Sequence, residues 1–583
     1  MTDSLTHKLT GMLEQIYPSL DTPWLAGELL DTMGLADDSQ GPPAHQNNWD
    51  ESEILLITYG DTVLRPDEKP LHTLKQFLDD CLADTVTAVH VLPFFPYSSD
   101  DGFSVTDYRA VNEALGDWDD IRAIGSRYHL MADLVINHMS VRSQWFENFR
   151  RRVRPGRDYF IEMEPTRDLN EVVRPRTSPL LVPVQTDEGE RHVWCTFSED
   201  QADLNFANPQ VLLEFVGILR FYLEQGVRIF RFDAVAYLWK EPGTTCIHLQ
   251  QTHEIIKVLR LLVEHHTPRA IIVTETNVPN RENLTYFGNA NEAHVIYNFS
   301  LPPLLINTLV SGNCRHLKTW MMSMPPAQLG TSYLNFIASH DGVGLRPTDG
   351  LLTEEEKQAL IRCMETFGGK VSYRRLPQGG EQPYEINISL WDALKGTELH
   401  GPDQWQLQRF LCAHAVMLAL EGIPGFYIHS LLGTGNDYGR VEQTGRFRSI
   451  NRSQWDLDAL EQELENPLSH HSQVFEQLKK LIALRRQQPA FHPNAAQFTL
   501  HLGLKIFGFW RQAMDSEQSI FCIFNITDEV QQLAVADINL IGTERWQDLI
   551  SGLEVEDLSG SLTLKPYQAM WLANLHGSES APE

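Results

Sequence analysis

Short apolar runs alternate with helical patterns through most of the chain. Each run is rich in β-branched and aromatic residues, which is typical of a buried parallel strand. The eight runs are Ile54–Gly60, Val86–Pro93, Leu130–Ile136, Val227–Asp233, Ile271–Glu275, His294–Pro302, Tyr333–Ala338 and Gly422–Ser430. Because eight successive strand–helix units close into a ring, the pattern predicts an α/β fold, a parallel (β/α)8 TIM barrel.

The spacing between the runs predicts parts that lie outside the barrel. Residues 1–53 look like a helical N-terminal extension, with a Gly-Pro-Pro break at residues 41–43. The segments 139–205 and 343–404 are too long for plain loops after a barrel strand, so each predicts an inserted subdomain at the C-terminal face of the barrel. The barrel itself then takes the segments 54–138, 206–342 and 405–487.

After about residue 488 the hydrophobic pattern changes to alternation with a period of two. We expect strands at Lys505–Arg511, Ser519–Thr527 and Leu562–Leu572. Period-two alternation is typical of strands with one buried face. We therefore expect residues 488–583 to form a C-terminal antiparallel β domain.

Composition and charge narrow the class of protein. The formal net charge is −30, which argues against nucleic acid and anionic membranes as partners. This acidity fits either a soluble surface or a saline habitat. The seven cysteines are scattered without a CxxC pair, so we expect reduced thiols and no cysteine metal site. No long apolar run or signal-like start is present, which predicts a cytoplasmic protein.

Three carboxylates come at the ends of three predicted strands, namely Asp233, Glu275 and Asp341. Barrel enzymes place their chemistry at the C-terminal ends of the strands. Cleavage of a glycosidic bond needs a carboxylate and a carboxylic acid on either side of it. One such acid alone is more simply a helix cap. Three in this order, with Arg231 and His340 beside them, predict sugar chemistry.

The motifs around these acids resemble the signature regions of the α-amylase superfamily, glycoside hydrolase family 13. The matching segments are Asp133–His138, Phe230–Val235, Ile272–Thr276 and Phe336–Asp341. Within the superfamily the chain looks like the sucrose phosphorylase group. The shared features are Leu92–Phe95, Asp101–Phe103, Val173–Arg176, Phe299–Leu305 and Ile450–Arg452.

The resemblance implies a retaining, double-displacement mechanism. Asp233 matches the nucleophile, Glu275 the acid/base and Asp341 the acid that stabilises the transition state. The apolar run before Glu275 is expected to raise its pKa by burial, and Arg231 to lower the pKa of Asp233.

The resemblance also implies the residues that bind substrate. Asp100 and Arg448 match a pair that holds the distal hydroxyls of glucose and closes the pocket. This closure predicts exo-acting chemistry on small α-glucosides. Phe197 is as readily explained by core packing. The full expected set is Asp100, Phe103, His138, Phe197, Arg231, His340 and Arg448.

The resemblance further implies phosphate and acceptor contacts from the two insertions, at Arg176, Tyr384 and Glu385. A solvated surface loop is the simpler explanation for Arg176, but Pro175 stiffens its segment and favours function. The sucrose enzymes usually carry glutamine after the matching tyrosine. We expect Glu385 to accept hydrogen bonds from a polyol and to repel an anionic acceptor.

The sequence thus predicts a retaining α-glucoside phosphorylase that releases α-D-glucose 1-phosphate. The preferred substrate is 2-O-α-glucosylglycerol. Glucosylglycerate, sucrose and sucrose 6′-phosphate remain alternatives, as does an amylosucrase-like transglucosylase or hydrolase. Degenerate, non-catalytic barrels usually lose one of the three acids, and here all three are present. We expect inorganic phosphate as co-substrate, with no cofactor and no metal. Related enzymes are often dimers, so a homodimer is a further expectation.

Overall fold

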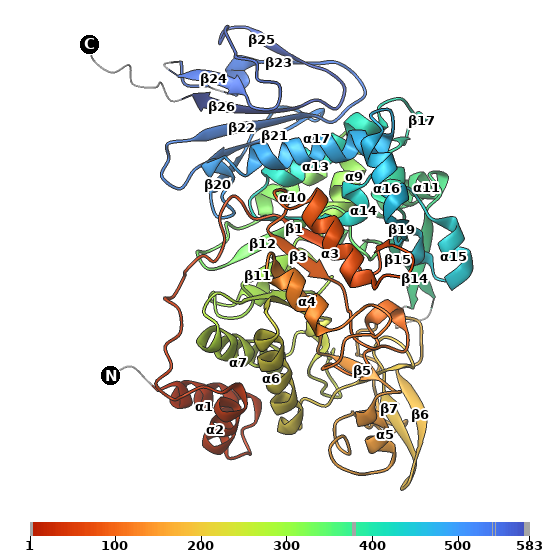
Figure 1. Ribbon diagram of the computed structural model, residues 1–583. Coiled ribbons are helices and arrows are strands. Elements are labelled where there is room, and N and C mark those ends of the chain that lie inside the picture. Colours follow the sequence, from red (N-terminus) through yellow and green to blue (C-terminus); the bar gives the residue numbers. More distant parts are fainter. Residues whose placement is uncertain (1–3, 376–379, 539, 543, 576–583) are drawn as a thin grey trace.

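The computed structural model describes residues 4–375, 380–538, 540–542 and 544–575, and eight parallel strands close a barrel at its centre (Figure 1). Each of the eight predicted runs supplies one strand, so the predicted fold class is confirmed. Around the ring the order is β1, β18, β12, β11, β10, β9, β4 and β3. The strands are β1 Leu55–Thr58, β3 Ala88–Val91, β4 His129–Val135, β9 Val227–Asp233, β10 Ile271–Thr274, β11 Val295–Tyr297, β12 Ser332–Phe336 and β18 Ile423–Tyr427.

Amphipathic or largely buried helices cover the outside of the barrel. In α6, Asn208 caps the first turn and a proline occupies the first helical position, which is a favourable helix start. None of the described helices combines the length and the apolar character needed to cross a membrane. The main helices are α3 Pro70–Cys81, α4 Trp118–Gly125, α6 Pro209–Glu224, α7 Gln250–His266, α9 Leu301–Ser311, α10 Arg315–Ser323, α13 Gln406–Ala419, α16 Leu457–Glu465 and α17 His470–Arg485.

The N-terminal segment forms a helical hairpin, α1 (Leu5–Ile16) and α2 (Thr22–Met33). It packs against α6 and α7 on the outside of the barrel (Figure 1). The buried positions of α1 recur every three or four residues, which gives the helix one apolar face. The hydroxyl of Tyr17 donates to the carbonyl of Phe206 at 2.7 Å. This buried hydrogen bond ties the hairpin to the segment that precedes α6.

Two insertions follow β4 and β12 at the C-terminal face of the barrel. The second carries a three-stranded sheet in the order β13, β15, β14. The first holds β5 His138–Ser140, α5 Gln144–Arg150, β6 Leu181–Thr186, β7 Gly189–Trp194 and β8 Gln201–Asp203. The second holds β13 Val343–Gly344, α11 Glu354–Thr366, β14 Lys370–Arg375, β15 Glu381–Asn387 and α12 Leu390–Ala393.

The C-terminal part is an antiparallel sheet in the order β20, β21, β22, β26, β24. The predicted strand Leu562–Leu572 is in fact two strands, β25 and β26. They pair with different partners, because the turn at Pro566 and the positive φ of Tyr567 (52°) separate them. The strands are β20 Ala496–Thr499, β21 Ile506–Gln512, β22 Ser519–Asn525, β23 Gln531–Ala534, β24 Arg545–Asp548, β25 Ser561–Leu564 and β26 Ala569–Leu575.

Candidate active site

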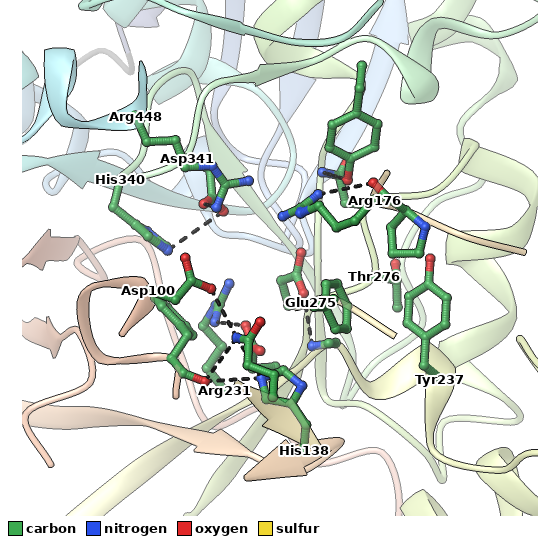
Figure 2. Close-up of a pocket in the computed structure, with 18 residues that line it drawn as sticks. Asp100, His138, Arg176, Arg231, Tyr237, Glu275, Thr276, His340, Asp341 and Arg448 are labelled. Carbon is green, nitrogen blue, oxygen red and sulfur yellow. Dashed lines mark hydrogen bonds and ion pairs between the residues drawn. The ribbon is translucent and has the colours of Figure 1, made fainter. Parts of the chain in front are cut away.

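A pocket at the C-terminal ends of the barrel strands collects nearly all the predicted site residues (Figure 2). It lies between the barrel and the two insertions, as expected for a TIM-barrel enzyme. Of the thirteen predicted residues, Glu385 does not line it. Those that do are Asp100, Phe103, His138, Arg176, Phe197, Arg231, Asp233, Glu275, His340, Asp341, Tyr384 and Arg448.

The end of β9 places Asp233 in the floor of this pocket beside a buried guanidinium. Nη1 of Arg231 lies 2.7 Å from Oδ1 of Asp233 and 2.5 Å from Oδ1 of Asp133 on β4. Burial raises the pKa of Asp233, and Arg231 opposes that rise without cancelling it. Arg231 thus lowers the pKa of Asp233 as expected, but the net shift, set by burial, is upward. The guanidinium limits the cost of burying the carboxylate.

Glu275 follows β10 and points into the same space. Its Oε2 accepts a hydrogen bond from the amide of Ala234 at 3.0 Å. Ala234 has a positive φ of 52°, which turns the chain sharply after Asp233. Burial raises the pKa of Glu275 to about 7; Arg231 opposes the rise and the charge of Asp233 adds to it. A carboxyl group with this pKa exchanges a proton readily at neutral pH.

Asp341 follows β12 and is paired with Arg448 of the short helix η5 (Phe447–Asn451). Oδ1 of Asp341 lies 2.5 Å from Nη1 of Arg448. Burial alone would raise the pKa of Asp341, but the positive charge of Arg448 holds it well below the usual range. The ring of His340 stacks on Phe103 with centroids 5.2 Å apart. Burial lowers the pKa of His340 to about 3, so this imidazole is neutral.

Glu385 lies in a different place from the one expected. It sits on β15 with 3% of its surface exposed, behind Arg448 rather than in the pocket. Its carboxylate accepts hydrogen bonds from Nε and Nη2 of Arg448, at 3.0 and 2.9 Å. The amide of Gly342 donates to the same carboxylate. These partners neutralise its charge, so the expected repulsion of an anionic acceptor has no basis in this arrangement.

Asp100 and Arg448 both line the pocket, but each of them is bonded to other residues. Oδ2 of Asp100 accepts a hydrogen bond from Nε2 of Gln201 at 3.0 Å, whereas Arg448 binds Asp341 and Glu385. Asp100 has a positive φ of 56°, which a short aspartate tolerates better than most residues. Both side chains face the pocket in Figure 2.

Arg176 enters the pocket from the first insertion. Its guanidinium lies 5.6 Å from the ring centroid of Phe197 and 5.3 Å from that of Tyr384. Nη1 donates to the carbonyl of Pro175 at 3.3 Å. The surface-loop explanation of Arg176 and the core explanation of Phe197 therefore both give way to a place in the pocket wall.

His138 lines the pocket and is held by its neighbours. Its Nε2 lies 3.0 Å from the carbonyl oxygen of Phe103, and its Nδ1 lies 3.2 Å from Nδ2 of Asn137. Nζ of the buried Lys240 contacts Oδ1 of Asn137 at 2.7 Å and Oδ2 of Asp203 at 2.6 Å. The ion pair with Asp203 thus fixes the amide that orients the His138 ring.

Four polar residues of the pocket were missed by the sequence reasoning: Gln201, Tyr237, Thr276 and Asn277. Two of them directly follow Glu275, and Tyr237 lies four positions after Asp233. Their nearness to the predicted acids was the available signal. Gln201 gave none, because it reaches the pocket through the folding of the first insertion.

Comparison with known proteins places these residues in a family. The family model for the α-amylase catalytic domain matches residues 80–347 of this chain. A glucosylglycerate phosphorylase from Spirochaeta thermophila is 43% identical over 90% of this chain and 90% of its own length. The protein of the same name from Escherichia coli is 40% identical over 97% of this chain and 100% of its own.

The chain belongs to the α-amylase family. Within it, the chain is an enzyme of the glycoside phosphorylase class. A glucosylglycerol phosphorylase from Marinobacter adhaerens is 28% identical over 76% of this chain and 88% of its own. Among solved structures, the sucrose 6F-phosphate phosphorylase from Thermoanaerobacter thermosaccharolyticum superposes with a TM-score of 0.71. The two sequences are 24% identical, and the superposition covers 83% of this chain and 96% of that protein's chain. This similarity supports the α-amylase fold.

The pocket of this α-amylase family member supplies the groups that glycoside chemistry needs. It offers a carboxylate at Asp233, an exchangeable proton at Glu275 and a second carboxylate at Asp341. Arg176, Arg231 and Arg448 bring three positive charges to the same small space. Two of these cations are already bound to carboxylates, and only Arg176 lacks such a partner within the described part of the chain.

Proposed function

We propose that this phosphorylase cleaves 2-O-α-glucosylglycerate with inorganic phosphate and releases α-D-glucose 1-phosphate and glycerate. The choice of an anionic acceptor rests on the guanidinium of Arg176. It lines the pocket and has no carboxylate partner among the residues that the structure describes. A planar guanidinium binds carboxylate and phosphate oxygens in pairs. One such group is suited to hold glycerate and then phosphate.

The relatives support the same choice. The two reported relatives named for glucosylglycerate are 40 and 43% identical to this chain, against 28% for the one named for glucosylglycerol. The preference for glucosylglycerol rested on a negative charge of Glu385 in the acceptor site and on the net charge of the chain. Since Arg448 neutralises the charge of Glu385, an argument against glycerate no longer follows.

The reaction runs through two displacements. The carboxylate of Asp233 attacks the anomeric carbon and forms a glucosyl ester, while Glu275 protonates the departing glycerate oxygen. Glycerate leaves and phosphate takes its place beside Arg176. A phosphate oxygen then attacks the anomeric carbon and breaks its bond to Asp233, while the carboxylate of Glu275 takes the proton from phosphate. Asp341 and Arg448 hold the glucosyl hydroxyls through both steps. Since each step inverts the anomeric centre, the product keeps the α configuration.

Arg176 serves the two anions in turn because they never need the site together. In the view of Figure 2, Arg176 lies with Tyr237 and Thr276 on one side of Glu275, and Asp100 and His340 lie on the other. This arrangement separates an anion side from a glucose side, with the acid between them. The ring centroid of Tyr384 lies 5.3 Å from the guanidinium of Arg176, so Tyr384 belongs to the anion side as well.

The reaction is tested in reverse, by phosphate release from α-D-glucose 1-phosphate. D-glycerate, glycerol, fructose and fructose 6-phosphate are offered separately. We expect D-glycerate to give the highest kcat/KM. The variant Arg176→Gln should raise the KM for D-glycerate, and the KM for phosphate in the forward reaction, roughly tenfold each.

Arg157→Gln is the matched control, since Arg157 lies in the same insertion but is 47% exposed and pairs with Asp158 and Glu188. It should leave both KM values unchanged. A preference for glycerol would overturn the choice of glycerate. Equal phosphate release with and without every acceptor would instead establish hydrolysis.

A further inference from the structure

Glu385 occupies a position that the proposed reaction does not explain. The register between β14 and β15 shifts at Ser372 and Tyr373, so Tyr384 lies opposite no residue of β14, and Tyr384 and its neighbour Glu385 contact different parts of the site. Tyr384 faces Arg176 and the anion side of the pocket, whereas Glu385 faces Arg448 on the glucose side. One strand of the second insertion thus reaches both halves of the site.

The contacts of Glu385 fix the orientation of Arg448. Nε of Arg448 lies 3.0 and 3.2 Å from the two carboxylate oxygens of Glu385, and Nη2 lies 2.9 Å from Oε2. This leaves Nη1 to face Asp341, at 2.5 Å. The guanidinium therefore spans two carboxylates, one behind the pocket and one inside it.

The backbone after Asp341 is fitted to the same carboxylate. A Cβ at position 342 would lie 2.5 Å from Cγ of Glu385 and 2.7 Å from the carbonyl oxygen of Ile386, so only glycine fits there. The amide of Gly342 donates to Glu385, and the strand β13 that follows pairs with β15. Glu385 thus holds both Arg448 and the chain that carries Asp341.

We propose that Glu385 is a positioning residue for the glucose subsite and takes no part in the choice of acceptor. It shares the charge of Arg448, which would otherwise fall wholly on Asp341 and close the space that the distal glucose hydroxyls need. This inference rests on the proposed roles of Asp341 and Arg448 in glucose binding. It does not depend on which acceptor the enzyme uses.

The test is the reverse reaction of Glu385→Gln with α-D-glucose 1-phosphate. We expect kcat/KM for glucose 1-phosphate to fall roughly tenfold, because a neutral amide cannot hold the guanidinium by charge. The ratio of kcat/KM between D-glycerate and glycerol should stay at its wild-type value. A second measurement uses 4-deoxy-α-D-glucose 1-phosphate, which lacks one distal hydroxyl. The loss of kcat/KM from glucose 1-phosphate to this analogue should be smaller in the variant than in the wild type, because the variant no longer binds that hydroxyl firmly.

Tyr384→Phe is the control on the same strand, and it should change the KM of the anions without altering the penalty for the 4-deoxy analogue. Glu385→Asp keeps the charge but shortens the reach, so it provides a second variant if glutamine prevents folding. A shifted glycerate-to-glycerol ratio in either Glu385 variant would overturn the proposal, as would an undiminished penalty for the analogue. If the wild type prefers glycerol, the proposed function fails while this test still stands.

Discussion

At the scale of single residues, one small pocket gives three carboxyl groups three different environments. Glu275 is buried near the charges of Asp233 and Asp341, and its pKa rises to about 7. Asp341 is equally enclosed, but Arg448 holds its pKa low. Burial raises the pKa of Asp233, and Arg231 compensates part of that rise. Environments that push pKa values apart separate a general acid from a nucleophile.

The raised pKa of Glu275 predicts the pH dependence of glucoside cleavage. Above about pH 7 the residue loses the proton that the departing glycerate oxygen needs. We therefore expect kcat/KM for the glucoside to fall as pH rises through 7, roughly tenfold for each pH unit well above that point. Steady-state rates of phosphorolysis, measured from about pH 5 to about pH 9, give the profile that checks this expectation.

α-D-Glucosyl fluoride serves as the control substrate, because fluoride leaves without a proton. Its kcat/KM should stay level across the same alkaline range. Equal alkaline losses for the fluoride and the glucoside would mean that another group titrates, and would remove Glu275 from the acid role.

At the scale of elements, the sequence predicts the barrel well and the loops poorly. All eight apolar runs become barrel strands, because a strand buried on both faces must be apolar along its length. The positions of Asp233 and Glu275 at the strand ends could therefore be predicted from the limits of the apolar runs. Those of Gln201 and Glu385 could not, since their partners are set by how the insertions fold back. The prediction of one strand at residues 562–572 was wrong because Pro566 and the positive φ of Tyr567 place a turn inside the run, and the strands on either side of it pair with different partners.

The N-terminal hairpin offers a prediction about packing. Leu9 of α1 is fully buried against the rest of the protein. We expect Leu9→Ala to destabilise the hairpin by about 3 kcal/mol, because a large side chain is replaced by a cavity. Hydrogen exchange in α1 and α2 should accelerate accordingly. Phosphorolysis should keep its wild-type kcat, since the hairpin packs against α6 and α7 outside the barrel.

Gly11 lies in the same helix and supplies the opposite change. A Cβ at this position would have no atom within 4 Å. Gly11→Ala should therefore stabilise α1 by about 0.5–1 kcal/mol, through the lower entropy of the unfolded chain. Slower exchange with Leu9→Ala, or faster exchange with Gly11→Ala, would contradict this account of the hairpin.

At the scale of the whole molecule, a buried arginine joins the C-terminal sheet to the barrel. Arg511 of β21 is fully buried, and burial lowers its pKa to about 10. Nη1 donates to the carbonyl of Ala419 at 2.6 Å, and Nη2 to those of His492 and Ala495 at 2.8 and 3.3 Å. Ala419 is the last residue of α13, so the guanidinium satisfies a carbonyl that the helix itself leaves open.

Arg511→Met tests this connection, because methionine keeps the apolar stem and removes the donors. Two effects oppose each other: the cost of burying a charge disappears, but three buried carbonyls lose their partner. Unsatisfied buried groups cost more in sum, so we expect a loss of roughly 2–4 kcal/mol. It should appear as a lower thermal midpoint and as faster hydrogen exchange in β20 to β22. Lys505→Met is the control, since Lys505 forms an exposed pair with Glu529 and should leave the midpoint unchanged. Equal midpoints for the two variants would show that apolar packing alone holds the sheet to the barrel.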